Sequence, residues 1–95
     1  MYARLAILQG TPERAKEARE AIAERFVPRM NELPGLKAAH FLQGEDGKVV
    51  VLTLFETESD VVAAREPAKR LREAASSELG LTVVSVEELE VIDSV

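Results

Sequence analysis

Short apolar runs alternate along this chain with segments whose apolar residues have helical spacing. Three runs, residues 2–9, 36–43 and 48–56, have the length and the boundaries of β-strands. Residues 44–47 (Gly-Glu-Asp-Gly) join the second run to the third, and their Asp-Gly step is typical of a tight turn between antiparallel strands. A last strand is predicted over about residues 81–92, which is long enough to contain a bulge.

Two segments between these runs are predicted to be helices. The first begins at Thr11-Pro12-Glu13, which combines a capping residue, a proline and an acidic residue, and Pro28 is expected to kink its last turns. The second begins near residues 57–59, is expected to be split at Pro67, and ends at Gly80. The apolar positions of the two helices are Ala15, Ala18, Ile22, Phe26, Met30 and Leu33, then Val61, Ala64, Ala68, Leu71, Ala75 and Leu79.

The element order β-α-β-β-α-β predicts a ferredoxin-like α+β fold. In this fold a four-stranded antiparallel sheet has two helices on one face, because both crossovers are right-handed. Ninety-five residues suffice for one such domain, which is predicted to span residues 1–95.

The predicted third strand, residues 48–56, is apolar on both faces, and the first two strands are nearly so. A turn loop of two or four residues pairs even positions of the second strand with odd positions of the third. That register places His40 on the same face as Thr53 and Phe55. Two helices cover only one face, so we expect a homodimer that packs sheet to sheet. The alternative is a monomer whose long terminal strand folds over the open face.

Composition limits the classes of partner that this chain is expected to bind. The formal charge of −5 argues against nucleic-acid and anionic-membrane partners, since both are recognised by cationic surfaces. No apolar run approaches the roughly 18 residues of a membrane span. The chain has no cysteine, which excludes disulfides and fits a reducing, cytoplasmic location.

His40 is the first candidate for chemistry, because its unperturbed pKa lies near neutrality. One interpretation makes it a base, or an axial haem ligand, in a pocket formed with Phe26, Met30, Thr53 and Phe55. The other makes it a partly buried histidine with a satisfied hydrogen bond. The second is favoured, since no carboxylate lies on its predicted face to orient it.

Charged residues offer further candidates. Arg4 on the first strand could hold an anionic ligand or pair with Glu87, Glu88 or Glu90 on the last strand. Those carboxylates alternate between the two faces of one strand, so no metal site is predicted, and no cofactor is expected. The basic residues of the second helix are interleaved with acidic ones and are expected to form pairs on the helix surface; they are Arg65, Lys69, Arg70 and Arg72, with Glu66 and Glu73.

Four segments together resemble the dimeric α+β-barrel superfamily, and within it the antibiotic-biosynthesis-monooxygenase-like group. These are Tyr2-Ala-Arg, Pro34-Gly35-Leu36-Lys37, Leu52-Thr-Leu-Phe-Glu56 and Val83-Val-Ser-Val-Glu-Glu. The resemblance implies two ferredoxin-like subunits packed sheet to sheet, each with a pocket between helices and sheet. It also implies oxidation of aromatic polyketides without a cofactor, or haem degradation, by Asn, Trp and His side chains. This chain has no Trp, and Phe55 stands where many relatives have one.

Two functions follow as hypotheses. The favoured one is a small homodimeric protein that binds a hydrophobic molecule between helices and sheet and performs no reaction. The alternative is a cofactor-independent monooxygenase-like enzyme, or a haem-binding protein, that uses His40. The sequence leaves open whether the protein is an enzyme, because this architecture is shared by many unrelated activities.

Overall fold

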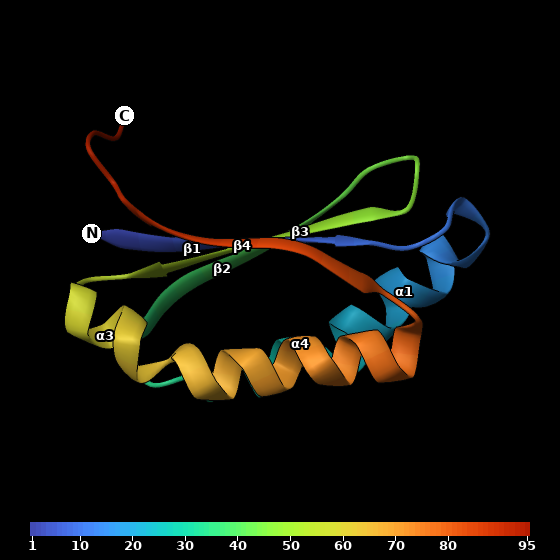
Figure 1. Cartoon of the computed structure of the whole chain (residues 1–95), viewed down its shortest axis with the longest axis horizontal. Helices are drawn as coiled ribbons and strands as arrows, with labels where there is room; N and C mark the ends of the chain where they lie inside the picture. Colours follow the sequence, from blue (N-terminus) through green and yellow to red (C-terminus); the bar gives the residue numbers. More distant parts are fainter.

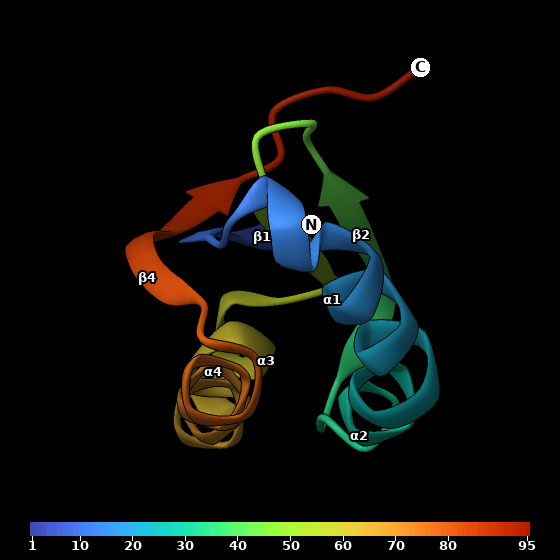
Figure 2. The ribbon, with the colours of Figure 1, turned by 90° about the vertical axis from the view of Figure 1, so that its right-hand side faces the viewer.

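A computed structural model describes all of residues 1–95 and confirms the predicted α+β architecture. Its four strands form one antiparallel sheet in the order β2-β3-β1-β4 (Figures 1 and 2). The strands are β1 (Tyr2–Gln9), β2 (Leu36–Gln43), β3 (Lys48–Phe55) and β4 (Thr82–Glu90). The last strand is shorter than predicted, and a shift in its pairing with β1 at Ile7/Leu8 confirms the expected bulge.

All helices lie on one face of the sheet, as Figures 1 and 2 show. The first helical segment comprises η1 (Pro12–Arg14), α1 (Ala15–Ala21), η2 (Ile22–Phe26) and α2 (Val27–Met30), and the second comprises α3 (Glu58–Ala63) and α4 (Arg65–Leu79). None of these helices combines the length and the apolar character that crossing a bilayer requires.

Both prolines that interrupt the helical patterns have visible effects. Pro28 has no N–H to donate to the carbonyl group of Glu24, and just before it the helix widens into the π-helical turn η2. The second helix is split, as expected, but the break lies at Ala64, so α4 begins at Arg65 and not at Pro67 as predicted. Pro67 therefore lies in the first turn of α4, where backbone N–H groups have no partner within the helix.

The hairpin between β2 and β3 has a different register from the predicted one. The N–H of Gly44 donates a hydrogen bond to the carbonyl oxygen of Lys48, with an N···O distance of 2.9 Å. The loop therefore has three residues and ends at Gly47, whose φ of 88° is the left-handed conformation typical of such loops. A three-residue loop pairs even-numbered residues of β2 with even-numbered residues of β3, so His40 lies opposite Leu52. The prediction that His40 shares a face with Thr53 and Phe55 is wrong.

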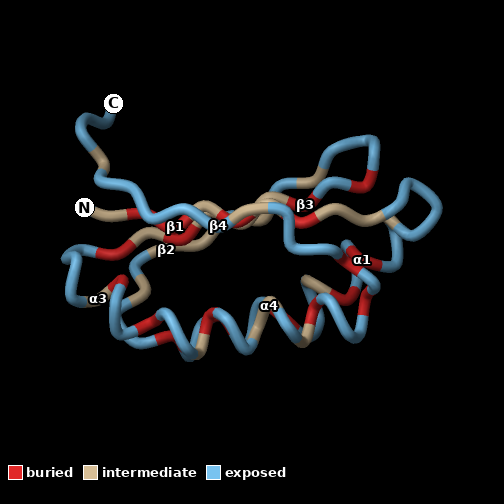
Figure 3. Tube along the Cα trace, viewed as in Figure 1, coloured by how far each residue is buried: buried red, intermediate tan, exposed pale blue.

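The core lies between the sheet and the helices (Figure 3). Its largest cluster joins Leu8 and Val49 of the sheet to Phe26 and Leu79 of the helices. A second cluster surrounds Met30, and a third surrounds Phe55. Burial of these apolar side chains is the main favourable contribution to folding.

No element covers the other face of the sheet (Figure 1). This open face consists of side chains from all four strands: Ala3, Leu5, Ile7, Gln9, Ala38, His40, Leu42, Lys48, Val50, Leu52, Leu54, Ser85, Glu87 and Leu89. Leu42 and Leu89 are 52% and 45% exposed. Residues 91–95 leave the sheet without packing on this face, and Ile92 is 92% exposed. The alternative in which the terminal segment folds over the open face is therefore wrong.

Candidate functional site

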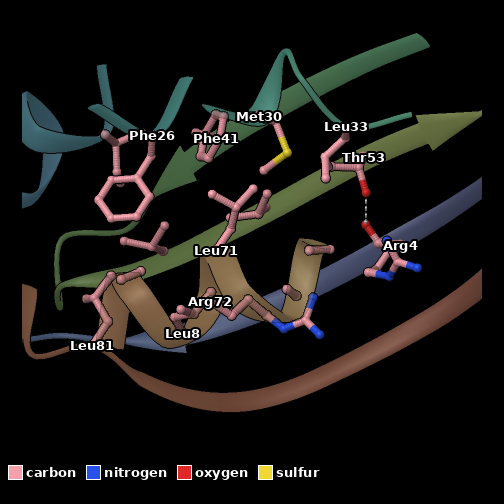
Figure 4. Close-up of a pocket in the computed structure, with 16 residues that line it drawn as sticks. Arg4, Leu8, Phe26, Met30, Leu33, Phe41, Thr53, Leu71, Arg72 and Leu81 are labelled. Carbon is pink, nitrogen blue, oxygen red and sulfur yellow. Dashed lines mark hydrogen bonds between the residues drawn. The ribbon is translucent and has the colours of Figure 1, made fainter. Parts of the chain in front are cut away.

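A cavity of about 50 Å³ lies between the sheet and the helices (Figure 4). Thirteen of its 16 lining residues are hydrophobic. The walls are formed largely by Ile22 and Phe26 of η2, Met30 of α2, Phe41 of β2 and Leu71 of α4. The volume is below the ~150 Å³ of a cavity that takes up benzene, so a ring-sized occupant requires lining side chains to move. Met30 suits such movement, since methionine is unbranched and flexible.

The structure separates the predicted site residues into three groups. Phe26, Met30 and Thr53 line the cavity together. Phe55 is fully buried in the neighbouring cluster and does not line it. His40 is exposed on the open face, on the opposite side of the sheet, because the three-residue loop sets its parity. The predicted pocket that combines His40 with these residues is therefore absent, and the favoured prediction of a partly buried His40 is also wrong.

Arg4 is the polar group buried deepest at the cavity. Its side chain is 3% exposed and extends from the central strand β1 toward the helices. Its Nη2 atom donates to the carbonyl oxygen of Val61 at 2.7 Å and to Oε2 of Glu88 at 3.2 Å. Its Nη1 atom is buried and has no hydrogen-bond partner. Arg4 also lies over the buried ring of Phe55, 5.6 Å from its centroid, in a cation–π contact.

Glu88 is shared between two arginines. Arg65 of α4 donates to both of its oxygens, at 2.7 and 2.9 Å, and Arg4 adds the third contact. The hydrogen bonds from Arg65, and then the one from Arg4, lower the pKa of Glu88 to about 2. The predicted pairing of Arg4 with the last strand is confirmed. Because Arg65 makes the shorter contacts, Glu88 satisfies only part of the donor capacity of Arg4.

Arg72 is the site residue that the sequence interpretation missed. It was expected on the helix surface, yet it lines the cavity and forms none of the ion pairs of the structure. Burial lowers its pKa, and the charge of Arg4 lowers it further, while Glu73 and Glu88 oppose that change. Figure 4 shows Arg72 extending toward the end of the pocket where Arg4 lies.

The polar groups of the cavity are therefore Arg4, Arg72 and Thr53. Thr53 donates a hydrogen bond of 3.4 Å from Oγ1 to the carbonyl oxygen of Arg4. An arginine remains protonated in proteins and cannot accept a proton. The lining thus includes no carboxylate, histidine or other base, and its chemistry suits binding and orientation of a ligand rather than proton abstraction. No group of three or more His, Asp or Glu side chains is placed to hold a metal ion.

Comparison with known proteins supports the fold. No family model matches the chain, and no curated protein matches its sequence. Solved structures are similar over nearly its whole length. HapK from Hahella chejuensis has 14% identity and a TM-score of 0.75, covering 99% of this chain and 95% of its own. The protein of unknown function NE2512 from Nitrosomonas europaea has 20% identity and a TM-score of 0.73, covering 98% and 90%.

A protein of Deinococcus radiodurans, described as a presumptive antibiotic biosynthesis monooxygenase, has 12% identity and a TM-score of 0.73. It covers all of this chain, which in turn covers 96% of it. Identities this low show the fold alone. The chain has the fold of the antibiotic-biosynthesis-monooxygenase-like group, and the resemblance predicted from the sequence is confirmed at that level.

Proposed function

We propose that this protein is a homodimer that binds a small hydrophobic molecule in the cavity between its helices and its sheet. The observation that supports binding most directly is the cavity lining, in which apolar side chains surround a few polar groups at one end. That combination is typical of small-molecule sites, where the apolar walls provide affinity and the polar groups fix orientation.

The monooxygenase-like alternative has weaker support. The cavity lining offers no side chain that could take a proton from a substrate, and His40 lies on the far side of the sheet. A haem ligated by His40 would have to sit on the open face rather than in the cavity.

A single-ring hydrocarbon tests ligand binding. Toluene is expected to raise the melting temperature of the wild-type protein, because a ligand that binds only the folded state stabilises it by mass action. In Ala75→Leu the larger side chain fills part of the cavity and should abolish that increase. The matched control is Ala63→Leu, which makes the same change at an exposed position of α3 outside the cavity. An equal response in all three proteins would rule out binding in the cavity.

The homodimer follows from the open face. Its side chains are mostly apolar and no part of the chain covers them. A second copy, related by a two-fold axis, offers the same apolar surface in return. A standard interface buries ~800 Å² per subunit, and burial of apolar surface on that scale favours association against its ~4–15 kcal/mol cost. We therefore propose sheet-to-sheet dimerisation.

Light scattering after size-exclusion chromatography tests the dimer. The wild-type protein should have twice the 10.4 kDa mass of one chain. Leu52 lies at the middle of the open face, between Leu5 and His40, so Leu52→Lys would bury a charge at the interface and should yield monomers. Val62→Lys, at an exposed site on α3, is the control and should remain dimeric. A wild-type mass of one chain would contradict the proposal.

A further inference from the structure

We infer that the ligand of the cavity is an apolar molecule with one anionic oxygen group, a carboxylate or an ionised enol or phenol, and that Arg4 and Arg72 bind this group. The inference rests on the proposed binding of a hydrophobic ligand and adds the chemical class of that ligand. It concerns the end of the cavity at which Arg4 lies and toward which the side chain of Arg72 extends (Figure 4).

The first observation is the unpartnered nitrogen of Arg4. A buried N–H group without a hydrogen-bond partner is costly, and nearly all such groups in folded proteins have one. Both hydrogen bonds of Arg4 to the protein come from Nη2, so Nη1 is left to a group that is not part of the chain. Because Arg4 lines the cavity, an occupant of the cavity is in position to supply the missing acceptor.

The second observation is the excess of positive charge. Arg4 and Arg72 both line the cavity, and no carboxylate lines it. Glu88 contacts Arg4 at 3.2 Å, but its two oxygens are bound by Arg65 at shorter distances, and Glu73 forms no ion pair with Arg72. Two cations held together in a partly buried site repel each other, and an anion between them removes that repulsion.

The third observation is the contrast between the two ends of the cavity. The walls around Phe26, Phe41 and Leu81 are apolar, whereas both guanidinium groups are at the other end (Figure 4). A molecule with a hydrocarbon body and an anionic head matches this division. Guanidinium groups bind carboxylates through paired N–H donors, a geometry that a neutral acceptor reproduces poorly.

Benzoate, benzamide and toluene test the inference, because they share one ring and differ in the charge and polarity of the substituent. Calorimetric titration of the full-length wild-type protein should show benzoate binding ~10-fold or more tightly than benzamide. Arg72→Gln should weaken benzoate ~10-fold and leave toluene within ~2-fold. Arg70→Gln makes the same substitution at an exposed position of α4 outside the cavity, and its affinities should match those of the wild type.

Each outcome decides a separate claim. If toluene binds but benzoate binds no better than benzamide, the anionic head group is ruled out and the hydrophobic cavity stands. If benzoate is preferred equally in the wild type and in Arg72→Gln, the binding site lies elsewhere and the inference is overturned. If none of the three compounds binds, both the proposed ligand binding and the inference that rests on it are overturned. Arg72 has no ion pair to lose, so Arg72→Gln is expected to fold even where Arg4→Gln does not.

Discussion

Replacing Glu88 with Gln tests the electrostatic network beside the cavity. Glu88 accepts hydrogen bonds from Arg65 and Arg4, and its folded-state pKa of about 2 lies below its ordinary value of 4.5. A difference of that size corresponds to ~3 kcal/mol of stability at neutral pH. The Glu88 side chain is 33% exposed, and screening by solvent reduces the expected value to ~1–2 kcal/mol.

The pH dependence of this effect has a definite sign. Because folding lowers the pKa of Glu88, its contribution to stability is fully present above about pH 4.5 and is lost as the pH falls toward about 2. Urea unfolding at fixed protein concentration should therefore show Glu88→Gln to be less stable than wild type by ~1–2 kcal/mol at neutral pH. At pH ~3 the difference should fall to less than half, since the unfolded carboxylate is then protonated.

A surface ion pair provides the control for this experiment. Glu56 pairs with Lys37 at 3.4 Å, and both side chains are more than half exposed. Glu56→Gln should change the free energy of unfolding by less than ~0.5 kcal/mol at either pH. A Glu88→Gln difference that is the same at neutral pH and at pH ~3 would refute the assignment of the effect to ionised Glu88.

Three further substitutions, one of them with a matched control, test the fold by urea unfolding. Gly47→Ala should lower the free energy of unfolding by more than ~1 kcal/mol, because Gly47 has a φ of 88° and an added Cβ would lie 2.6 Å from the carbonyl carbon of Thr11. Gly44→Ala, at a negative φ, is the control and should lower it less. Phe55→Ala should cost ~3–5 kcal/mol by leaving a cavity in a fully buried cluster, and a cost below ~1 kcal/mol would contradict the packing described. Thr57→Ala should cost ~1 kcal/mol through loss of the cap that its hydroxyl provides at the start of α3.

The strands and the helix breaks could be predicted from the sequence because local signals determine them. Apolar runs bounded by Gly10 and Gly35 gave the bounds of β1 and β2, and Pro28 and Pro67 indicated where the helices deviate. The pairing register depends instead on the conformation of three loop residues. Asp46-Gly47 fits two-, three- and four-residue loops alike, and one residue of difference moves every side chain of β2 to the other face.

The register explains why the candidate site was only partly predicted. Phe26, Met30 and Thr53 line the cavity whichever parity β2 adopts, since they lie on other elements. The face on which His40 lies depends on the register of β2, and so does the face on which Phe41 lies. In the observed register Phe41 lines the cavity in place of His40. A residue on a strand that is apolar on both faces cannot be assigned to one face from periodicity alone.

Arg72 shows a different limit of sequence interpretation. Its spacing of four residues from Ala68 and three from Ala75 would place it beside two cavity-lining residues of α4. An arginine at such a position lines a cavity with its apolar stem and places its charge at the end of that stem. The interleaved charges of α4 concealed this signal, because acidic and basic residues at those spacings also predict pairs on the helix surface.

Strand β1 links the two proposed properties of the protein. Arg4 and Ala6 lie on the helix face and line the cavity, while Leu5 and Ile7 lie on the open face between β3 and β4. Ligand binding and dimerisation therefore depend on alternate residues of one strand, and a substitution at either position should act directly on only one of the two properties. Sheet-to-sheet packing also places a second sheet behind β1, which would restrict movement of the strand that holds Arg4. On this reasoning, a variant that is monomeric through a change on the open face should keep its preference for an anionic ligand but bind that ligand more weakly.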